Sequence, residues 1–428
     1  MPETDVDVVV VGAGVAGLAA AAALGARHRR WAVFEAGGRI GGRAWTAHPP
    51  ALGGVPFDHG ASWLHDADRN PLVPIASAAG RTLLDADAVR CHRTFIGGRL
   101  ADAAELADYD RAYDRLVARA EARAASGQAD VSLAEALAAA DPADNRWAPT
   151  VAAWEGSIIA AADAADLSLL DWRNNALKGR NLAVVGGLGA LVQDGLGPAA
   201  GQVHLGTPVR RIAWQEAGGR VAVETASGTI TARACIVTVS TGVLAAGRIA
   251  FVPALPPEVQ EAVHALPMGL LSKVALRARG ADRLDLPAFC SVDRQISAAD
   301  PAMVFHAWPF GYDYVIGFFG GRAAWDLAAS GPAAAEDFAR RQLRGLFGAR
   351  ADRALGGAVV TGWGGDERFL GAYCYARPGA AAARARLAQP LAEGRLIFAG
   401  EGCHENLAGT VGGAYLSGMR AAAATPSW

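Results

Sequence analysis

Residues 6–17 read VDVVVVGAGVAG, and this stretch decides the fold. Its first six residues are mostly β-branched, which favours a strand buried on both faces, and the alanine-rich Leu18–Leu24 favours a helix. Between them, Gly12 permits a tight turn, Gly14 lets backbone amides approach a pyrophosphate, and Gly17 allows close packing of helix on strand. The helix N-terminus faces the phosphates with its partial positive charge. The stretch therefore predicts a dinucleotide-binding turn.

A second expected strand, Trp31 to Phe34, ends in an acid, Glu35. A carboxylate at this distance from the glycines accepts hydrogen bonds from an adenosine ribose, although a solvated glutamate beside a glycine turn is the alternative. An arginine-bearing glycine loop follows directly, with the sequence GGRIGGR over residues 37–43. A second loop that neutralises phosphate favours a buried FAD over a nicotinamide cofactor.

Composition narrows the class of protein. The 428 residues carry 40 Lys+Arg and 42 Asp+Glu, a net charge of −2, which argues against a strongly basic nucleic-acid-binding protein or a polybasic membrane anchor. A hydrophobic fraction of 52% supplies cores for two or three globular units. Five cysteines without a CxxC pair make a disulfide framework or a zinc site unexpected, and we expect no metal.

An uncharged stretch, residues 8–26, has about the length of a membrane span. The acids Glu3, Asp5 and Asp7 precede it where a signal peptide would carry basic residues, and three glycines interrupt it. We therefore expect a soluble, cytoplasmic protein with neither a membrane nor a nucleic acid as partner.

The C-terminal region repeats the pattern of strand, glycine loop and helix. An expected strand ends at Gly400 and Glu401, and a helix is expected from about Thr410 to Ala423. Its first amides form an anion-binding terminus, which would stabilise the negative charge of a reduced flavin and favour hydride acceptance. An ordinary docking helix is the alternative.

Lys273 lies in an alternating, strand-like segment, residues 268–276. Only two of the 40 basic residues are lysines, Lys178 and Lys273, so arginine would be the expected residue here. A compact ammonium with a tunable pKa can hold a water and exchange protons, whereas a guanidinium stays charged. Lys273 is the candidate catalytic residue, and an exposed strand lysine is the alternative.

Four separated segments resemble the flavin-containing amine oxidase family, which includes monoamine oxidases, polyamine oxidases and lysine-specific histone demethylases. They are residues 6–43, residues 57–65 (FDHGASWLH) with Asn70-Pro71, the strand-rich run 209–244, and residues 396–401 with 409–418. The polyamine oxidase branch is the nearest in motif. The resemblance implies an α/β fold, in which an FAD-binding Rossmann-type domain interleaves with a mixed α+β substrate domain.

The resemblance also assigns site residues. Lys273 would hold a water beside flavin N5. The implied cofactor contacts are Gly12, Ala13, Gly14, Gly17, Glu35, Gly41, Gly42, Arg43, Gly60, Ala61, Ser62, Trp63, Val209, Gly400, Glu401, Thr410 and Val411. The candidate pocket residues are Trp63, His65, Tyr373, Thr410 and Tyr415, with Trp308 and Phe310 as further aromatic candidates. Each aromatic residue could equally be a core residue. His65 matches a histidine of animal polyamine oxidases.

The expected domains are discontinuous. Residues 1–69, 183–250 and 390–428 would form the FAD-binding domain, and the largely helical 70–182 together with 251–389 would form the substrate domain. Tyr373 stands where monoamine oxidases carry the cysteine that joins flavin, so we expect FAD to be bound non-covalently. Thr410 stands where those enzymes have a tyrosine, which argues against a monoamine cage.

The leading functional hypothesis is an oxidase that transfers a hydride from the carbon beside an amine to FAD. The resemblance implies a polyamine-like substrate, imine hydrolysis, and oxygen as the acceptor with formation of hydrogen peroxide. A monoamine oxidase or an L-amino-acid oxidase is the alternative, and the latter would need a pocket arginine for the substrate carboxylate. A flavin-loaded scaffold without turnover is the alternative from another class. The oligomeric state and the acids that bind distal cations stay open.

Overall fold

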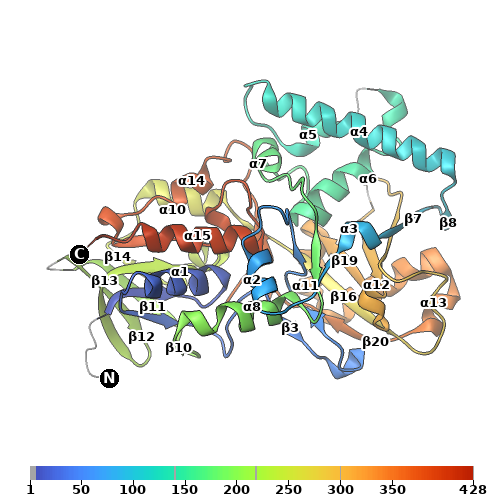
Figure 1. Cartoon of the computed structure of the whole chain (residues 1–428). Helices are drawn as coiled ribbons and strands as arrows, with labels where there is room; N and C mark the ends of the chain where they lie inside the picture. Colours follow the sequence, from blue (N-terminus) through green and yellow to red (C-terminus); the bar gives the residue numbers. More distant parts are fainter. Residues whose placement is uncertain (1–5, 139–140, 217–218, 299, 428) are drawn as a thin grey trace.

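The computed structural model describes residues 6–138, 141–216, 219–298 and 300–427. An eight-stranded sheet occupies one end of the molecule (Figure 1) and has the order β10-β2-β1-β13-β12-β11-β14, with β22 also paired to β13. Strands β10, β2, β1, β13 and β22 run parallel, whereas β11, β12 and β13 pair antiparallel. The strands are β1 (Val6–Val11), β2 (Trp31–Phe34), β10 (Val203–His204), β11 (Val209–Glu216), β12 (Arg220–Thr225), β13 (Gly228–Val237), β14 (Ala250–Val252) and β22 (Leu396–Phe398).

Helices cover both faces of this sheet. Successive residues of a central strand point to opposite sides, so the two sides of the strand pack against different helices. Val8 and Val10 pack with α1 (Val15–Ala26), α8 (Leu188–Leu196) and α15 (Val411–Ala423). Val9 and Val11 pack in a second core with α10 (Pro257–Ala265) and α14 (Ala383–Leu387). The predicted first strand, turn and helix and the predicted C-terminal helix are confirmed.

Helices α1 and α15 bring the two ends of the chain together. They lie side by side in Figure 1 and approach closely at Gly418, where an added Cβ would lie 2.0 Å from the carbonyl oxygen of Ala16. Any larger residue at 418 would push the helices apart. The contact places the N-terminal ends of both helices at the same cavity, which Val15 and Val411 line.

A seven-stranded sheet forms the other end of the molecule, in the order β20-β16-β19-β18-β17-β7-β8. Its strands are β7 (Cys91–Ile96), β8 (Arg99–Leu100), β16 (Leu271–Ala278), β17 (Cys290–Arg294), β18 (Val304–Ala307), β19 (Tyr314–Gly320) and β20 (Leu355–Val360). It packs in one core with α11 (Gly321–Ser330), α12 (Pro332–Phe347) and α13 (Ala349–Ala354). The chain also forms helices α2 (Leu72–Ala78), α3 (Ala86–Val89) and α9 (Thr241–Ala245).

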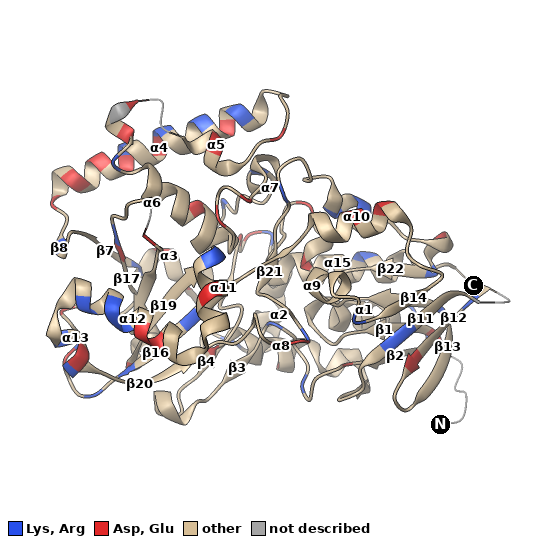
Figure 2. Ribbon diagram, turned by 180° about the vertical axis from the view of Figure 1, so that it is seen from behind, with Lys and Arg blue, Asp and Glu red and all other residues tan. Residues whose placement is uncertain are grey.

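A helical layer completes this end of the molecule. It consists of α4 (Ala103–Ala125), α5 (Leu133–Leu137), α6 (Ala148–Ala153), a π-helix (Trp154–Ala160) and α7 (Leu169–Asn174). Figure 2 shows both acidic and basic residues along α4, while its buried face carries alanine and leucine, including Leu116 and Ala120. Asp102 and Glu105 start α4 with a reciprocal capping box.

Small strands join the parts. Strand β9 (Leu182–Val184) pairs with β5 (Trp63–Leu64) and β6 (Leu83–Asp85), β3 (Thr46–Ala47) pairs with β4 (Phe57–Asp58), and β15 (Met268–Gly269) pairs with β21 (Tyr373–Cys374). The interleaved α/β architecture with a mixed second domain is confirmed. The proposed limits at 182/183 and 250/251 fall within strands β9 and β14.

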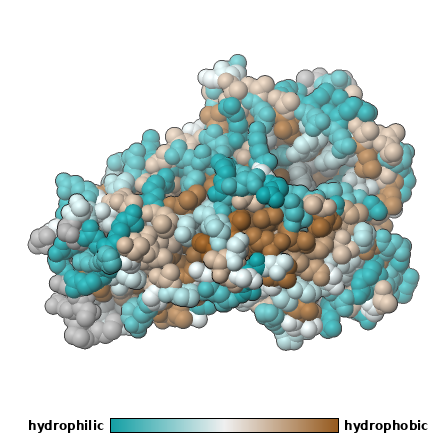
Figure 3. All heavy atoms as spheres, viewed as in Figure 1, coloured by the Kyte–Doolittle hydropathy of each residue, from teal (hydrophilic) through white to brown (hydrophobic). Residues whose placement is uncertain are grey.

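Apolar residues gather near the middle of the face seen in Figure 3, between the two ends of the molecule, and hydrophilic residues surround them. Within the described ranges, no helix combines the length and the apolar character that a membrane crossing requires.

Candidate active site

A cavity of about 1080 Å³ lies between the two parts. Its volume lies just above the range of ordinary ligand pockets, about 300–1,000 Å³. Both helix starts described above line it, together with strand β16, the π-helix and the loop before α15. The cavity therefore touches residues 6–43, 57–65, 209–244 and 396–418 as well as Lys273.

The glycine turn is held by steric fit and by Glu35. An added Cβ on Gly17 would lie 1.9 Å from the carbonyl oxygen of Gly12, and Gly12 has a φ of 99°. The carboxylate of Glu35 accepts hydrogen bonds from the backbone amides of Ala13 at 2.8 Å and Gly37 at 2.6 Å. Glu35 thus fixes both glycine loops and lines the cavity.

An ion pair joins the first and last of the predicted segments. Arg43 donates to Glu401 at 2.9 Å and to the carbonyl oxygen of Ala372 at 2.8 Å. Glu401 is buried and also accepts hydrogen bonds from the amides of Cys374 and Gly409. A guanidinium therefore lies at the cavity wall with its charge partly compensated.

The start of α15 lies in the same wall. The Thr410 hydroxyl accepts a hydrogen bond from the amide of Gly413 at 2.9 Å and donates to the carbonyl oxygen of Leu407 at 2.7 Å. A helix start leaves its first amides without intrahelical partners, and its dipole attracts negative charge. Thr410 and Val411 both line the cavity, so this terminus can stabilise an anion there.

Lys273 is buried on β16 and lines the cavity. Its ammonium donates to the carbonyl oxygens of Asp58 at 2.8 Å and Gly60 at 2.6 Å, and to the Ser62 hydroxyl at 2.7 Å. Burial lowers the pKa of Lys273 to about 8, and the neighbouring Asp58 carboxylate opposes this shift. All three ammonium protons thus have protein partners, and a lone pair becomes available only when the amine is neutral.

His65 belongs to a hydrogen-bonded chain. The Asn181 amide group donates to the Asp87 carboxylate at 3.1 and 3.2 Å, so its oxygen faces His65 Nδ1 at 2.7 Å. A carboxylate only accepts hydrogen bonds, and this fixes the Asn181 orientation and places the His65 proton on Nδ1. Burial lowers the pKa of His65, so the ring is neutral at pH 7 and its Nε2 can accept a hydrogen bond.

Glu155 is a buried carboxylate in the cavity wall. It accepts hydrogen bonds from the Tyr113 hydroxyl at 2.5 Å and from Trp172 Nε1 at 2.9 Å. Each carboxylate oxygen keeps a second lone-pair direction for another donor. Glu155 lies in the π-helix, and such irregular helical turns are frequent at functional sites. Burial raises the pKa of Glu155.

The cavity brings most of the predicted residues together. Its lining includes Gly12, Gly14, Glu35, Gly41, Gly42, Arg43, Gly60, Ala61, Ser62, Trp63, His65, Val209, Lys273, Tyr373, Gly400, Glu401, Thr410 and Val411. Ala13 and Gly17 belong to the glycine turn but do not line the cavity. Tyr415 is not in the lining, because its side chain packs against the core below α15.

Two aromatic candidates also lie outside this lining. Phe310 borders a separate cavity of about 70 Å³, and Trp308 is a buried residue in the core of the seven-stranded sheet.

Several lining residues could not be identified from the sequence. Glu155, Tyr113, Asn181, Arg90 and His306 all line the cavity. Glu155 and Tyr113 come from the helical layer, where nothing in the sequence distinguishes an inward acid from a solvated one. The π-helix that turns Glu155 inward has no sequence signature.

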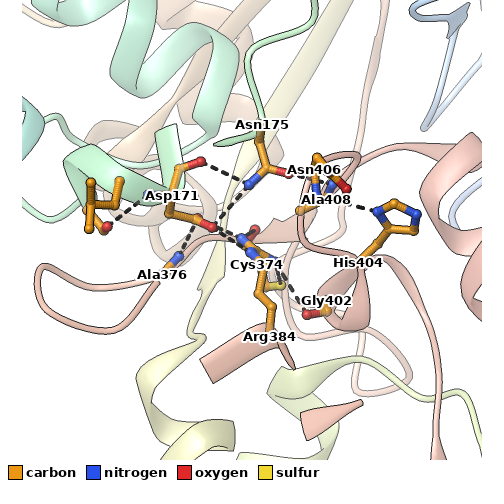
Figure 4. A network of polar contacts seen from close by, with 12 residues as sticks. Asp171, Asn175, Cys374, Ala376, Arg384, Gly402, His404, Asn406 and Ala408 are labelled. Carbon is orange, nitrogen blue, oxygen red and sulfur yellow. Dashed lines mark hydrogen bonds and ion pairs between the residues drawn. The ribbon is translucent and has the colours of Figure 1, made fainter. Parts of the chain in front are cut away.

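A buried network supports the wall behind Glu401 (Figure 4). Arg384 is 1% exposed and forms a two-bond ion pair with Asp171, at 2.6 and 2.8 Å. It also donates to the carbonyl oxygens of Cys374 and Gly402 and to the Cys374 thiol. Asn175 extends the network, because it donates to Asp171 and accepts from the amide of Ala408. The helical layer is thereby tied to the loop that precedes α15.

Residues 15–425 match the family model described as "Flavin containing amine oxidoreductase". The chain belongs to this family. Polyamine oxidase 4 of Oryza sativa subsp. japonica is 28% identical over 97% of this chain and 87% of its own length. A lysine-specific histone demethylase 1 homolog 3 of the same plant is 30% identical, and the match covers 97% of this chain but 53% of that protein.

Solved structures show the same fold. Cyclohexylamine oxidase from Brevibacterium oxydans superposes with a TM-score of 0.80 at 24% identity over 98% of both chains. Putrescine oxidase bound to putrescine superposes with a TM-score of 0.80 at 20% identity over 99% of both chains. Because the family model spans residues 15–425, the chain is a flavin-dependent amine oxidoreductase, and the predicted family is confirmed.

The residues present fit the flavin cofactor that the family implies. Two helix starts face the cavity, Gly12 and Gly14 leave its wall free of side chains at the turn, and Arg43 supplies a positive charge. The Glu35 carboxylate borders the same space. These are donor and acceptor groups of the kind that hold phosphates and a ribose.

We expect the Glu35→Ala variant to lose cofactor affinity by about tenfold or more. The substitution would remove the predicted ribose acceptor and would leave the amides of Ala13 and Gly37 without their carboxylate. The measurement is the flavin content after gel filtration and the dissociation constant of the reconstituted protein. Glu261→Ala, an exposed position on α10, is the matched control. A Glu35→Ala protein that keeps its full yellow colour would contradict the ribose assignment.

Proposed function

We propose that this amine oxidoreductase is an FAD-dependent oxidase of polyamine-like substrates, and that it binds FAD non-covalently. The bound cofactor would accept a hydride from the carbon beside the substrate nitrogen. Hydrolysis of the resulting imine would release an aldehyde, and oxygen would be the final acceptor, with hydrogen peroxide as its product. The observation that carries the substrate class is the buried Glu155 carboxylate in the wall of the cavity.

Glu155 suits a distal ammonium group. A polyamine carries several positive charges, and a buried cation needs a partner of opposite charge. Tyr113 and Trp172 hold the carboxylate in place, which lowers the entropy lost when a substrate ammonium binds. Glu121 also lines the cavity; it is partly exposed and its carboxylate pairs with Lys178 at 3.2 Å.

His65 suits the reacting amine, which must be neutral to lose a hydride. The neutral ring offers Nε2 as an acceptor without adding a positive charge that would repel the substrate. Trp63 lies beside His65, Phe318 packs against Trp63, and both give this part of the wall an apolar, aromatic character. We infer that His65 orients the amine and that the aromatic side chains exclude water from it.

The region around Tyr373 supports non-covalent binding. Its hydroxyl donates to the carbonyl oxygen of Ile159 at 2.7 Å, so this side chain has a structural role. The adjacent thiol, Cys374, is buried between Arg384 and Glu401. Burial and the Glu401 charge raise the pKa of Cys374, which makes the thiol a poor nucleophile.

We expect Glu155→Gln to lower kcat/KM for spermidine by about 30-fold or more, because a buried ammonium would lose its counter-charge. The value for benzylamine should change little, since a monoamine has no distal charge. Peroxide release in a panel of amines measures both. The Tyr113→Phe variant is the matched control, because it removes the hydrogen bond to Glu155 but keeps the carboxylate. Equal losses for spermidine and benzylamine would reject the distal-ammonium role.

An amino-acid oxidase is the second candidate, and Arg90 favours it. This arginine lines the cavity and lies 3.9 Å from the Asp87 carboxylate that ends the His65 chain. A guanidinium there could bind a substrate carboxylate. Turnover of L-amino acids that disappears in the Arg90→Met variant would support this function over amine oxidation.

A further inference from the structure

Two cysteine thiols meet where neighbouring strands of the seven-stranded sheet begin. Cys91 is the first residue of β7, Cys290 is the first residue of β17, and the two are directly opposite each other in a parallel pair. Their sulfur atoms are 3.3 Å apart although the residues are 199 positions apart in the chain. We propose that Cys91 and Cys290 are a peroxide-sensitive thiol pair that closes reversibly to a disulfide.

The backbone already suits this bond. Neighbouring strands lie about 4.7–4.9 Å apart, which is within the Cα separation of about 4.4–6.8 Å that disulfides span. An S–S bond of about 2.05 Å requires the two sulfur atoms to approach by roughly 1.2 Å, which small side-chain rotations supply. The strands therefore need no rearrangement for closure.

The two thiols differ in their environments, and this sets the order of events. Cys91 is partly exposed, whereas Cys290 is fully buried. Burial raises the pKa of the Cys290 thiol to about 12, and the Arg93 charge opposes the shift. An oxidant therefore reaches Cys91 first, and Cys290 is the resolving thiol.

The reaction balances with hydrogen peroxide as the oxidant. The Cys91 sulfur attacks one peroxide oxygen, the O–O bond breaks, and a sulfenic acid and one water form. The Cys290 sulfur then attacks the sulfenic sulfur, and the S–O bond breaks with release of a second water. Two thiols lose two electrons and two protons in total, and one peroxide is reduced to two waters.

The pair lies close to a source of peroxide, and this step rests on the proposed oxidase function. Arg90 and Phe289, which precede the two cysteines, both line the cavity of about 70 Å³. That small cavity shares Ser62, Trp63 and His306 with the large one. Peroxide formed in the large cavity would therefore meet the thiol pair near its point of release.

The test uses the complete holoenzyme with equimolar hydrogen peroxide. Trypsin digestion without reduction should give Cys91-His92-Arg93 joined to residues 284–294, with the mass of the two peptides less two hydrogens. Dithiothreitol should separate them. The thiol count should fall by two, and the oxidised protein should unfold at a higher temperature, because the bond closes a loop of 199 residues.

Variants decide the outcome. Cys91→Ser and Cys290→Ser should each abolish the joined peptide, whereas Cys235→Ala, which removes a buried thiol of β13, should retain it. Wild-type protein whose Cys91 stays a thiol, or ends as a sulfinic acid without the joined peptide, would overturn the proposal.

A second arm replaces added peroxide with spermidine and oxygen. If the joined peptide forms with added peroxide but not during turnover, the result supports the thiol pair and counts against peroxide formation from spermidine. If peroxide is released from spermidine but the joined peptide forms in neither arm, the result supports the oxidase function and overturns the thiol pair.

Discussion

The Arg384→Met variant is expected to lose about 3–5 kcal/mol of unfolding free energy, because the substitution leaves Asp171 buried without its counter-charge. All five guanidinium N–H groups have partners: two bonds go to Asp171, two to Cys374, and one to Gly402. Methionine can fill the volume but can make none of these bonds. Urea denaturation of the cofactor-free protein measures the change.

Two controls separate the charge from the packing. Asp171→Asn combined with Arg384→Met removes both charges but keeps an acceptor for the amide of Ala376, so we expect it to recover part of the loss. Arg350→Met removes an arginine that binds Asp282 and Asp285 on the surface, and should cost far less. If Arg384→Met unfolds at the same urea concentration as Arg350→Met, the network does not stabilise the fold.

The cofactor-binding half of the site follows from local sequence. A β-branched run, a glycine turn and an alanine-rich segment each prefer one local structure, so residues 6–26 predict β1, the turn and α1 without knowledge of the rest. The same holds for β22, Thr410 and α15. Glu35 could be placed because it ends a strand next to β1 and its role depends on a fixed spacing.

Other parts of the cavity wall could not be predicted, because they depend on contacts between distant segments. Asp171 and Arg384 are 213 positions apart, and each alone reads as an ordinary surface charge. Tyr415 shows the limit even within a well-placed helix. Ala414 faces the cavity, and Tyr415, about 100° further around α15, packs into the core instead.

For Lys273, the place in the site could be predicted from the sequence, but its contacts could not. Its rarity in an arginine-rich chain singled it out, and the structure places it in the cavity wall. Its three bonds to Asp58, Gly60 and Ser62 were not visible in the sequence, since they depend on a segment more than 200 positions away. The proposed role of Lys273 with a water therefore requires the neutral amine, and this makes the role dependent on pH.

We expect Lys273→Met to retain FAD but to slow flavin reduction or reoxidation by about tenfold or more. Stopped-flow absorbance follows the two half-reactions separately. Reoxidation by oxygen is the cleaner one, because no substrate amine is present to titrate. In the wild-type protein its rate should rise with pH around an apparent pKa of about 8, as Lys273 loses its proton. Methionine cannot titrate, so the variant's rate should stay flat.

The free energy of unfolding should also rise with pH. Burial lowers the pKa of Lys273 from 10.5 to about 8, so the unfolded chain binds more protons than the folded one between these values. The cost of charging the buried amine is therefore complete below about pH 8 and disappears as the pH rises toward 10.5. The slope of unfolding free energy against pH in this window should be smaller in Lys273→Met.

The chain's other lysine provides the control for both measurements. Lys178 is exposed and pairs with Glu121, so Lys178→Met should leave both half-reactions and the stability slope close to wild type. Ser62→Ala removes one acceptor of the Lys273 ammonium but keeps the amine, so the pH dependence of reoxidation should persist. A Lys273→Met protein with wild-type rates in both half-reactions would show that Lys273 only anchors the segment from Asp58 to Ser62.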